Sequence, residues 1–446
     1  MRTGTVNAGG RRARLAVALT AVLALGLAAC GGDDDADDPA ADGTEEQATG
    51  DGEEPVTLRV SWWGADERHN ATIAAIELFE AANPHVTIEP EFSGFDGYHD
   101  RLATQASGGN APDVFQLDPS AVKEYAERGV LLRLDDHAGD LLSLDAIPES
   151  VSGLGRTEEG LFSLPWGLTA PILMMRPDFL YETEAPQESW TWEDFEAWAS
   201  EVTEASNGDV HGTEDLGHRD DALRVWLRQR GKDFYTEDGQ LGFDEGDLTE
   251  WFTMWDRMRQ DGAAAPAEVT AQWDGTPENS TMANGHTTVE FGYTSVQQGF
   301  ADAANTEIEA VRPPGNSETP GDYLRPSVFL SVYADTAAPE VAVQFLDFML
   351  NDPESGMALG ATRGVPPNEN TRDAIRPEVS EAAVAELDYI ADVGERFGPP
   401  PPMPPPGAVE IINLLRRTYE EVSFDRTEPE IAAAQFFAEA EGIIGD

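Results

Sequence analysis

Segments with strand periodicity and segments with helical periodicity alternate between residues 58 and 118, and this alternation limits the folds that the chain can adopt. Val56, Leu58 and Val60 recur at every second residue, which is the period of a β-strand. The apolar residues of 66–82 recur instead at helical spacing, and further strands and helices follow. Strands that alternate with helices of this length are typical of a doubly wound sheet. We therefore expect an α/β fold with mostly parallel strands flanked by helices.

Aromatic and polar side chains stand at the ends of two of these expected strands. The first strand ends in Trp62 and Trp63, and a later one ends in Gln116 and Asp118. Ligands of open α/β sheets bind at the carboxyl ends of the strands. Successive side chains of a strand point to opposite faces, so one tryptophan is expected at a ligand and the other in the core. This edge is the first candidate for a binding site.

The first residues have the pattern of an export signal. Arg11, Arg12 and Arg14 precede an apolar run over 15–24 that is too short to span a membrane comfortably, and Cys30 follows small residues. The surroundings of Cys30 resemble the lipobox of bacterial lipoproteins, in which the cysteine is lipidated and becomes the new N-terminus. A plain signal peptide with a chance cysteine is the alternative. The arginine pair leaves both the general and the twin-arginine export routes open.

Residues 31–54 lack aromatic and basic side chains and are rich in acidic ones. Such a segment cannot bury enough apolar surface to fold, and its charges extend it. We expect a signal peptide at 1–29 and a disordered acidic tether at 30–54, followed by a folded body. The chain has one cysteine, so the body has none for disulfide bonds and depends on its core for stability.

The formal net charge of the chain is −56, with 84 acidic and 28 basic side chains. A nucleic-acid-binding protein needs a basic face, so this charge argues against that class. Lysine occurs only as Lys123 and Lys232. The acidity and the scarcity of lysine fit a saline habitat or a GC-rich genome, and both origins stay open.

Short motifs along 55–446, in their order and spacing, resemble the extracellular solute-binding proteins of bacterial ABC importers. The resemblance is to family 1, the maltose-binding-like branch that serves carbohydrates. Each motif is short, and it is their succession after a lipobox that carries the resemblance. The motifs are residues 60–64, 68–69, 79–84, 108–114, 164–167, 190–195, 282–285, 337–350 and 363–366.

The resemblance implies two α/β lobes with a ligand cleft between them. We expect 55–168 and 290–329 in lobe 1, and 169–289 and 330–446 in lobe 2. The implied function is capture of a mono- or oligosaccharide by lobe closure and its delivery to ABC permease subunits in the membrane. The protein is expected to be a monomer, anchored by lipid to the outer face of the cell membrane.

A sugar presents apolar C–H faces to aromatic rings and hydroxyl groups to carboxylates, amides and guanidinium groups, so its site combines these residue types. At the end of the first strand, the position in the family favours Trp63 over Trp62. The residues expected to contact the ligand are Trp63, Arg68, Gln116, Asp118, Trp166, Trp273, Tyr293 and Arg363.

Several of these residues have a structural alternative. Arg68 can be an ordinary surface arginine, Asp118 can cap a helix, and Trp166 can pack between the lobes. Trp273 stands in a polar loop, where a bulky apolar side chain needs a partner. Trp226 follows a helical pattern and is expected in the core.

Two further segments have local signals. Thr191 is a favourable N-cap, and Asp194 three residues later can complete a capping box. Residues 204–220 are polar, and we expect a surface loop there.

The sequence offers little support for an enzyme. It contains neither a phosphate-binding loop of the Gly-x-x-x-x-Gly-Lys type nor a Gly-x-Ser-x-Gly elbow. Its 7 histidines are scattered without the spacing of metal ligands, so we expect no catalytic residues, no metal site and no cofactor. An exported glycoside hydrolase, a receptor for a solute other than a sugar and a scaffold lipoprotein are the alternatives.

Overall fold

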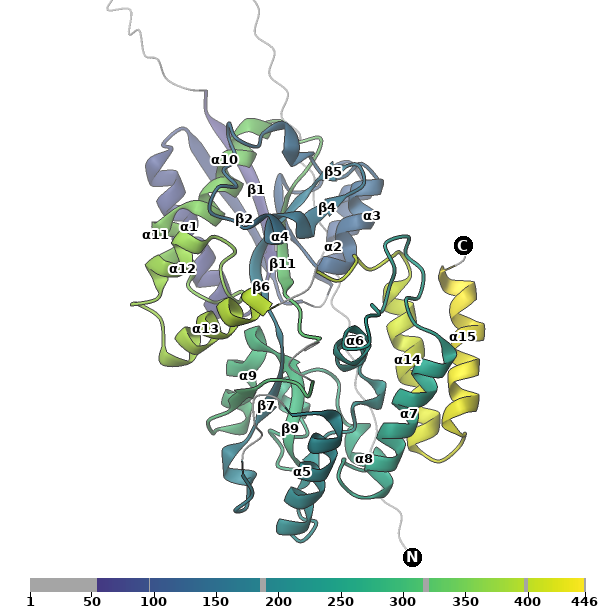
Figure 1. Ribbon diagram of the computed structural model, residues 1–446. Coiled ribbons are helices and arrows are strands. Elements are labelled where there is room, and N and C mark those ends of the chain that lie inside the picture. The colour runs from purple at the N-terminus through teal and green to yellow at the C-terminus, as the bar shows by residue number, and fades with distance from the viewer. Residues whose placement is uncertain (1–53, 96, 185–189, 316–320, 397–399, 445–446) are drawn as a thin grey trace, which may run out of the picture. The chain divides into compact units, whose positions relative to one another are not determined.

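Two larger β-sheets organise the computed structural model, which describes residues 54–95, 97–184, 190–315, 321–396 and 400–444 (Figure 1). The predicted signal peptide, Cys30 and the acidic tether up to residue 53 lie outside the described residues. No helix among the described residues is long and apolar enough to cross a membrane.

The first sheet has five strands in the order β2-β1-β3-β11-β6. β1 pairs in parallel with β2 and β3, whereas β11 runs antiparallel to both β3 and β6. The strands are β1 Val56–Trp63, β2 Val86–Ser93, β3 Val114–Leu117, β6 Ser163–Thr169 and β11 Arg325–Val332. A small separate hairpin is formed by β4 Arg156–Thr157 and β5 Gly160–Leu161.

The second sheet has four strands in the order β10-β7-β9-β8, and among them only the β8–β9 pair is parallel. The strands are β7 Pro171–Met175, β8 His211–Thr213, β9 Thr287–Tyr293 and β10 Glu309–Val311. The predicted α/β class with two sheets is confirmed, but the expectation of mostly parallel strands is wrong. The strands that carry the chain from one sheet to the other, β6 and β7 on the way out and β11 on the return, run antiparallel to their neighbours.

Helices cover each sheet and close a separate apolar core over it. The first core is formed by residues of the first sheet and by α1 Asp66–Ala82, α2 Tyr98–Ser107, α3 Val122–Glu127, α10 Pro339–Asn351 and α11 Pro353–Leu359. The second is formed by residues of the second sheet and by α5 Trp192–Ala205, α6 Asp220–Arg228, α7 Glu245–Gln260, α14 Ala408–Ser423 and α15 Pro429–Ile444. The remaining helices are α4 Glu149–Ser152, α8 Ala267–Thr270, α9 Gln297–Ala304, α12 Glu369–Ile375 and α13 Glu381–Arg396.

The sheets assign the chain differently from the expected lobe boundaries. All of 290–329 was expected in lobe 1, yet β9 and β10 belong to the second sheet and only β11 belongs to the first. Of 330–446, α10 and α11 pack against α1 of the first sheet, and α14 and α15 pack against α7 of the second (Figure 1). The crossing from β6 to β7 is a single residue, Ala170, and nothing in the local sequence marks it as a point where the chain changes sheets.

The chain passes between the sheets at three places. β6 leads into β7 through Ala170 alone, and β10 returns to β11. The third passage is the proline-rich segment before α14, in which the described residues 400–405 form neither helix nor strand.

The predicted capping box at the start of α5 is confirmed. The backbone N–H of Asp194 donates to Thr191 Oγ1 at 3.1 Å, and the N–H of Thr191 donates to Asp194 Oδ2 at 2.9 Å. Each side chain thus satisfies a backbone donor that the first turn of a helix leaves unpaired.

We expect Thr191→Ala to lower the free energy of unfolding by about 1 kcal/mol, because an N-cap hydrogen bond is lost. Urea unfolding followed by circular dichroism measures this. Thr249→Ala is the matched control, since Thr249 lies inside α7 and its hydroxyl bonds only to the Glu245 carbonyl. An equal loss of stability in both variants would contradict the role given to the cap.

Candidate functional site

A cleft of about 1010 Å³ lies among elements of both sheets. Its wall includes Phe95, His99 and Asp118 from the first-sheet side, and Arg224 and Arg416 from α6 and α14 of the second. The proline-rich segment 401–406 forms a further part of the wall. Pockets that take small molecules in proteins are typically about 300–1,000 Å³, so the cleft has room for a ligand of considerable size.

Trp63 stands behind the aromatic part of this wall. Its ring centroid lies 4.9 Å from that of Tyr98, 5.1 Å from His99 and 5.8 Å from Phe95. Trp63 is 7% exposed, whereas Phe95 is 57% exposed and lines the cleft directly. Phe95 is absent from the residues predicted above, although an aromatic residue just after the end of β2 is a signal that could have found it.

Trp62 points to the opposite face of β1, as the strand period requires. It is fully buried, and its Nε1 donates to His69 Nδ1 at 3.1 Å. Its ring packs against Phe92 with centroids 5.2 Å apart. Of the two tryptophans, Trp63 is therefore the one on the side of the cleft.

Asp118 lines the cleft and also caps the turn that follows β3. Its Oδ1 accepts hydrogen bonds from the Ser120 backbone at 2.9 Å and from the Ser120 hydroxyl at 2.6 Å. Oδ2 accepts no hydrogen bond from the described residues, so the two alternatives for Asp118, ligand contact and helix cap, are compatible in the structure.

Tyr293 lies directly behind the polar part of the wall. The guanidinium of Arg325 is 4.7 Å from the centre of its ring, and its hydroxyl is 3.1 Å from that of Tyr323. Arg325 and Tyr323 both line the cleft. Burial raises the pKa of Tyr293, which therefore stays protonated and can donate.

Trp273 has a partner that explains its place in a polar loop. Its Nε1 donates to Glu290 Oε1 at 2.9 Å, and the guanidinium of Arg219 lies 4.3 Å from its ring centre. Arg416 of the cleft wall is 5.3 Å from the same ring centre. Trp273 itself is not among the residues that line the cleft.

Arg68, Gln116, Trp166 and Arg363 come together away from the cleft wall. The guanidinium of Arg363 lies 3.7 Å from the ring centre of Trp166 and donates to Gln116 Oε1 at 3.3 Å. Arg68 donates to the carbonyl of Thr362, the residue before Arg363, at 2.8 and 3.1 Å. The structure thus brings these candidates into one cluster, and their contact with a ligand stays a prediction.

Residues 204–220 were expected to form a surface loop, and this expectation is wrong from Val210 onward: 207–209 are an exposed turn after α5, whereas 212–219 are buried. Glu214 and Asp215 are fully buried, and Arg219 is 6% exposed. The segment contains β8 and passes through the second core instead of over the surface. Its polar side chains satisfy one another, which hydropathy along the sequence cannot detect.

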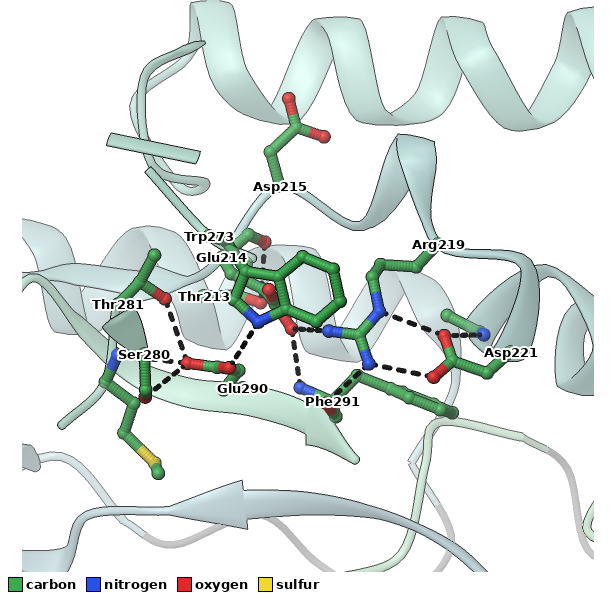
Figure 2. A network of polar contacts seen from close by, with 12 residues as sticks. Thr213, Glu214, Asp215, Arg219, Asp221, Trp273, Ser280, Thr281, Glu290 and Phe291 are labelled. Atoms are coloured by element: carbon green, nitrogen blue, oxygen red, sulfur yellow. Dashed lines mark hydrogen bonds and ion pairs between the residues drawn. The ribbon is translucent and has the colours of Figure 1, made fainter. Parts of the chain in front are cut away.

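The buried charges of this segment form a network with β9 (Figure 2). Arg219 binds Glu214 at 3.3 Å, Asp221 at 2.8 Å and the Phe291 carbonyl at 2.9 Å. Glu214 in turn accepts from the Phe291 backbone at 2.7 Å. Burial raises the pKa of Glu214 well above its usual range, and the positive charge of Arg219 opposes this shift.

Glu290 of β9 is the second buried acid that organises this side of the protein. Besides Trp273, it accepts from the hydroxyls of Ser280 at 2.6 Å and Thr281 at 3.2 Å, and from the Met282 backbone at 3.2 Å (Figure 2). The carboxylate therefore fixes the loop before β9 onto the sheet. Among the described residues, no group of three His, Cys, Asp or Glu side chains could hold a metal ion.

The geometry defines a two-sheet α/β protein whose cleft collects the ends of strands and helices from both sheets. The family model described as "Bacterial extracellular solute-binding protein" matches residues 74–385. The chain therefore belongs to the family of bacterial extracellular solute-binding proteins, which confirms the resemblance predicted from the motifs.

Curated relatives and solved structures agree with this membership. The chain is 27% identical to an uncharacterized lipoprotein in the oleD 5' region of Streptomyces antibioticus, over 76% of this chain and 73% of that protein. It is 23% identical to the diacetylchitobiose binding protein DasA of Streptomyces coelicolor, over 84% of this chain and 86% of that protein. A family 1 extracellular solute-binding protein from Alicyclobacillus acidocaldarius has a TM-score of 0.73 at 27% identity, covering 89% of this chain and all (100%) of that one.

His218 gives the second core a dependence on pH. Burial lowers its pKa to about 3, and the positive charge of Arg219 contributes to the decrease. Both ring nitrogens lack a hydrogen-bond partner among the described residues. An unfolded histidine has a pKa of about 6.5, so below that pH the unfolded chain takes up a proton that the folded chain does not.

The contribution of His218 to stability is therefore complete above pH 6.5 and is lost as the pH falls toward 3. We expect the loss of this contribution to make the free energy of unfolding about 2 kcal/mol lower at pH 5 than at pH 7. In His218→Gln this difference between pH 7 and pH 5 should shrink by that amount, measured by urea unfolding at both pH values. The exposed His286→Gln is the control, and identical pH differences in both variants and the parent would refute the assignment.

Proposed function

We propose that the protein captures a mono- or oligosaccharide in the cleft of about 1010 Å³ and delivers it to the permease subunits of an ABC importer. The observation that carries this proposal is the composition of the cleft wall. The exposed ring of Phe95 stands beside the polar groups of His99, Asp118 and Arg325. A sugar needs this combination, because its ring faces are apolar and its rim is covered with hydroxyl groups.

The aromatic ring and the polar side chains of the cleft wall are proposed to contact different parts of the sugar. The ring of Phe95, supported by Trp63 behind it, offers an apolar surface to C–H groups. Arg325 and the Tyr323 hydroxyl can donate to sugar oxygens, and Asp118 can accept from sugar hydroxyls. The binding of diacetylchitobiose stated for the Streptomyces coelicolor relative supports a carbohydrate ligand.

Binding is proposed to proceed by closure of the two sheets and their helices over the ligand. The ligand shifts the balance between open and closed forms only as far as it binds the closed form better. The passage from β6 to β7 through Ala170 is short enough to act as a hinge. The protein is proposed to bind and release the sugar unchanged, so incubation with oligosaccharides should yield no new reducing ends.

We propose that the protein lies at the outer face of the cell membrane and is anchored there by a lipid on Cys30. It is proposed to act as a monomer. The 27% identical relative from Streptomyces antibioticus is described as a lipoprotein, which supports this anchor. A single anchored end and an acidic tether would leave the binding body free to reach the permease.

We expect Cys30→Ser to move the protein from the membrane fraction to the soluble or secreted fraction, because the thiol that takes the lipid is lost. Detergent phase partitioning of expressing cells measures the distribution. Thr44→Ser in the tether is the control and should keep the distribution of the parent. Detergent-phase partitioning of Cys30→Ser at the level of the parent would exclude the anchor.

Phe95→Ala is expected to weaken sugar binding by about 1–3 kcal/mol, because an exposed stacking ring is removed from the cleft. Titration calorimetry with the sugar that gives the largest thermal shift in a panel measures the loss. Phe92→Ala is the matched control: Phe92 is also exposed and close by, but it packs on Trp62 and His69 and is outside the cleft lining.

Trp63→Ala should weaken binding as well, since the ring behind Phe95 is lost. Stabilisation by a peptide, a polyamine or a metal ion, with none by any sugar, would overturn the carbohydrate assignment. Equal effects of Phe95→Ala and Phe92→Ala would show that the site is placed wrongly.

A further inference from the structure

Arg363 is a buried cation without an acidic partner. Its side chain is 3% exposed, and no carboxylate lies within 4.0 Å of it among the described residues. Arg219 and Arg259, whose side chains are almost as little exposed, are paired: Arg219 binds Glu214 and Asp221, and Arg259 contacts Asp215. In a chain with 84 acidic and 28 basic side chains, an unpaired buried arginine is an exception that needs a cause.

The protein groups around Arg363 are neutral and use only part of its hydrogen-bonding capacity. Its Nη2 donates to Thr72 Oγ1 at 2.7 Å, and its Nε donates to Gln116 Oε1 at 3.3 Å. Three buried donors of this cluster have no acceptor among the described residues: Arg363 Nη1, Gln116 Nε2 and Trp166 Nε1. Each buried donor without an acceptor costs about 1–3 kcal/mol.

The direction of the Gln116 amide is fixed by this arrangement. Because its Oε1 accepts from Arg363, its Nε2 must be the free end of the amide. All three unpaired atoms are therefore donors, and an incoming group must accept hydrogen bonds from them. A water molecule would bring two donors of its own, whereas an anion brings none.

A second cation strengthens the positive charge at this place. Arg68 lies near Arg363, and its charge together with burial lowers the pKa of Arg363 well below its usual range. Arg68 is bonded to the carbonyl of Thr362 and, within the described part of the chain, to no carboxylate. Two guanidinium groups thus lie close together, and within the described part of the chain neither has a carboxylate within 4.0 Å.

The space next to these groups is small. A cavity of about 20 Å³ is walled by Trp166, Thr362 and Arg363 together with apolar side chains such as Met349 and Leu359. A cavity needs about 10–15 Å³ to hold a single water-sized particle. A space of this size suits a monatomic ion better than a carboxylate or a phosphate.

We propose that the Arg363 cluster binds one monatomic anion of the halide class, with chloride as the abundant member. The ion accepts hydrogen bonds from Arg363 Nη1 and Trp166 Nε1, whose residues line the cavity, and supplies the negative charge that Arg363 lacks. The site is separate from the sugar cleft, since none of these residues lines that cleft. Arg363 is close in sequence to Val365, which exchanges backbone hydrogen bonds of 2.7 and 2.9 Å with Leu168 of β6.

The first test is thermal unfolding of the protein in sodium chloride, sodium bromide and sodium gluconate at one constant ionic strength. We expect the melting temperature to rise with chloride or bromide along a saturating curve by about 2–4 °C and to stay level in gluconate. Crystals grown with bromide should show an anomalous peak at the Arg363 cluster. Equal melting temperatures in the three salts, with no peak there, overturn the proposal.

Two variants separate the ion from a general salt effect. Arg363→Met removes the cation and should abolish the chloride response. Gln116→Glu places a carboxylate beside Arg363 and should raise the melting temperature in gluconate while removing the chloride response. The second variant decides the matter if Arg363→Met fails to fold, because it keeps the arginine and supplies the anion from the protein.

Arg101→Met is the matched control. Arg101 also belongs to the first-sheet side and has no carboxylate partner among the described residues, but it donates to Ser93 and lies over the Tyr98 ring outside the cluster. It should keep the chloride response of the parent. Loss of the response in Arg101→Met, or its persistence in Gln116→Glu, contradicts the assigned site.

Discussion

The two sheets depend on a backbone passage of one residue. β6 ends at Thr169 and β7 begins at Pro171, so Ala170 alone belongs to neither sheet. Its carbonyl accepts from the Thr294 backbone at 3.1 Å, and the hydroxyls of Thr169 and Thr294 lie 3.2 Å apart. The end of β9 is thereby tied to the start of β7, and this linkage places Tyr293 beside the cleft. The proposed closure of the two sheets would have to bend this short, hydrogen-bonded passage together with the other two passages between the sheets.

The two cores bury charge in different ways. In the second core, Arg219 is compensated by Glu214 and Asp221, so the charges of the protein satisfy one another. In the first core, Arg363 is held by a hydroxyl, an amide and an aromatic ring. Removing one member of a compensated pair leaves a buried charge and is costly, whereas an uncompensated cation must obtain its counter-charge from outside the protein.

Sequence periodicity predicted the parts of the fold that depend on neighbouring residues. The strand at 56–63, the helix at 66–82 and the capping box of Thr191 and Asp194 follow from local patterns and are present. The strand directions and the points where the chain changes sheets depend on contacts between distant segments. The surface loop expected at 204–220 is buried because its charges find partners on β9, which composition cannot reveal.

The candidate site was likewise predictable where it depends on local patterns and not where it depends on contacts between distant residues. Alternation along β1 separated Trp62 from Trp63, and the end of β3 gave Asp118. Gln116 and Arg363 are 247 positions apart in the chain, and no local pattern in the sequence predicts that they contact each other. Phe95 was missed because it lies just beyond β2, although its exposure makes it the most accessible aromatic ring of the wall.

The proline-rich part of the cleft wall limits the hydrogen bonds that a ligand can form there. Over 401–406 every residue except Met403 is proline, and proline has no backbone N–H. This side of the cleft therefore offers carbonyl oxygens and ring methylene groups but almost no amide donors. A ligand that lies along it must supply the hydrogen atoms itself, which favours molecules rich in hydroxyl groups over those that carry only acceptors.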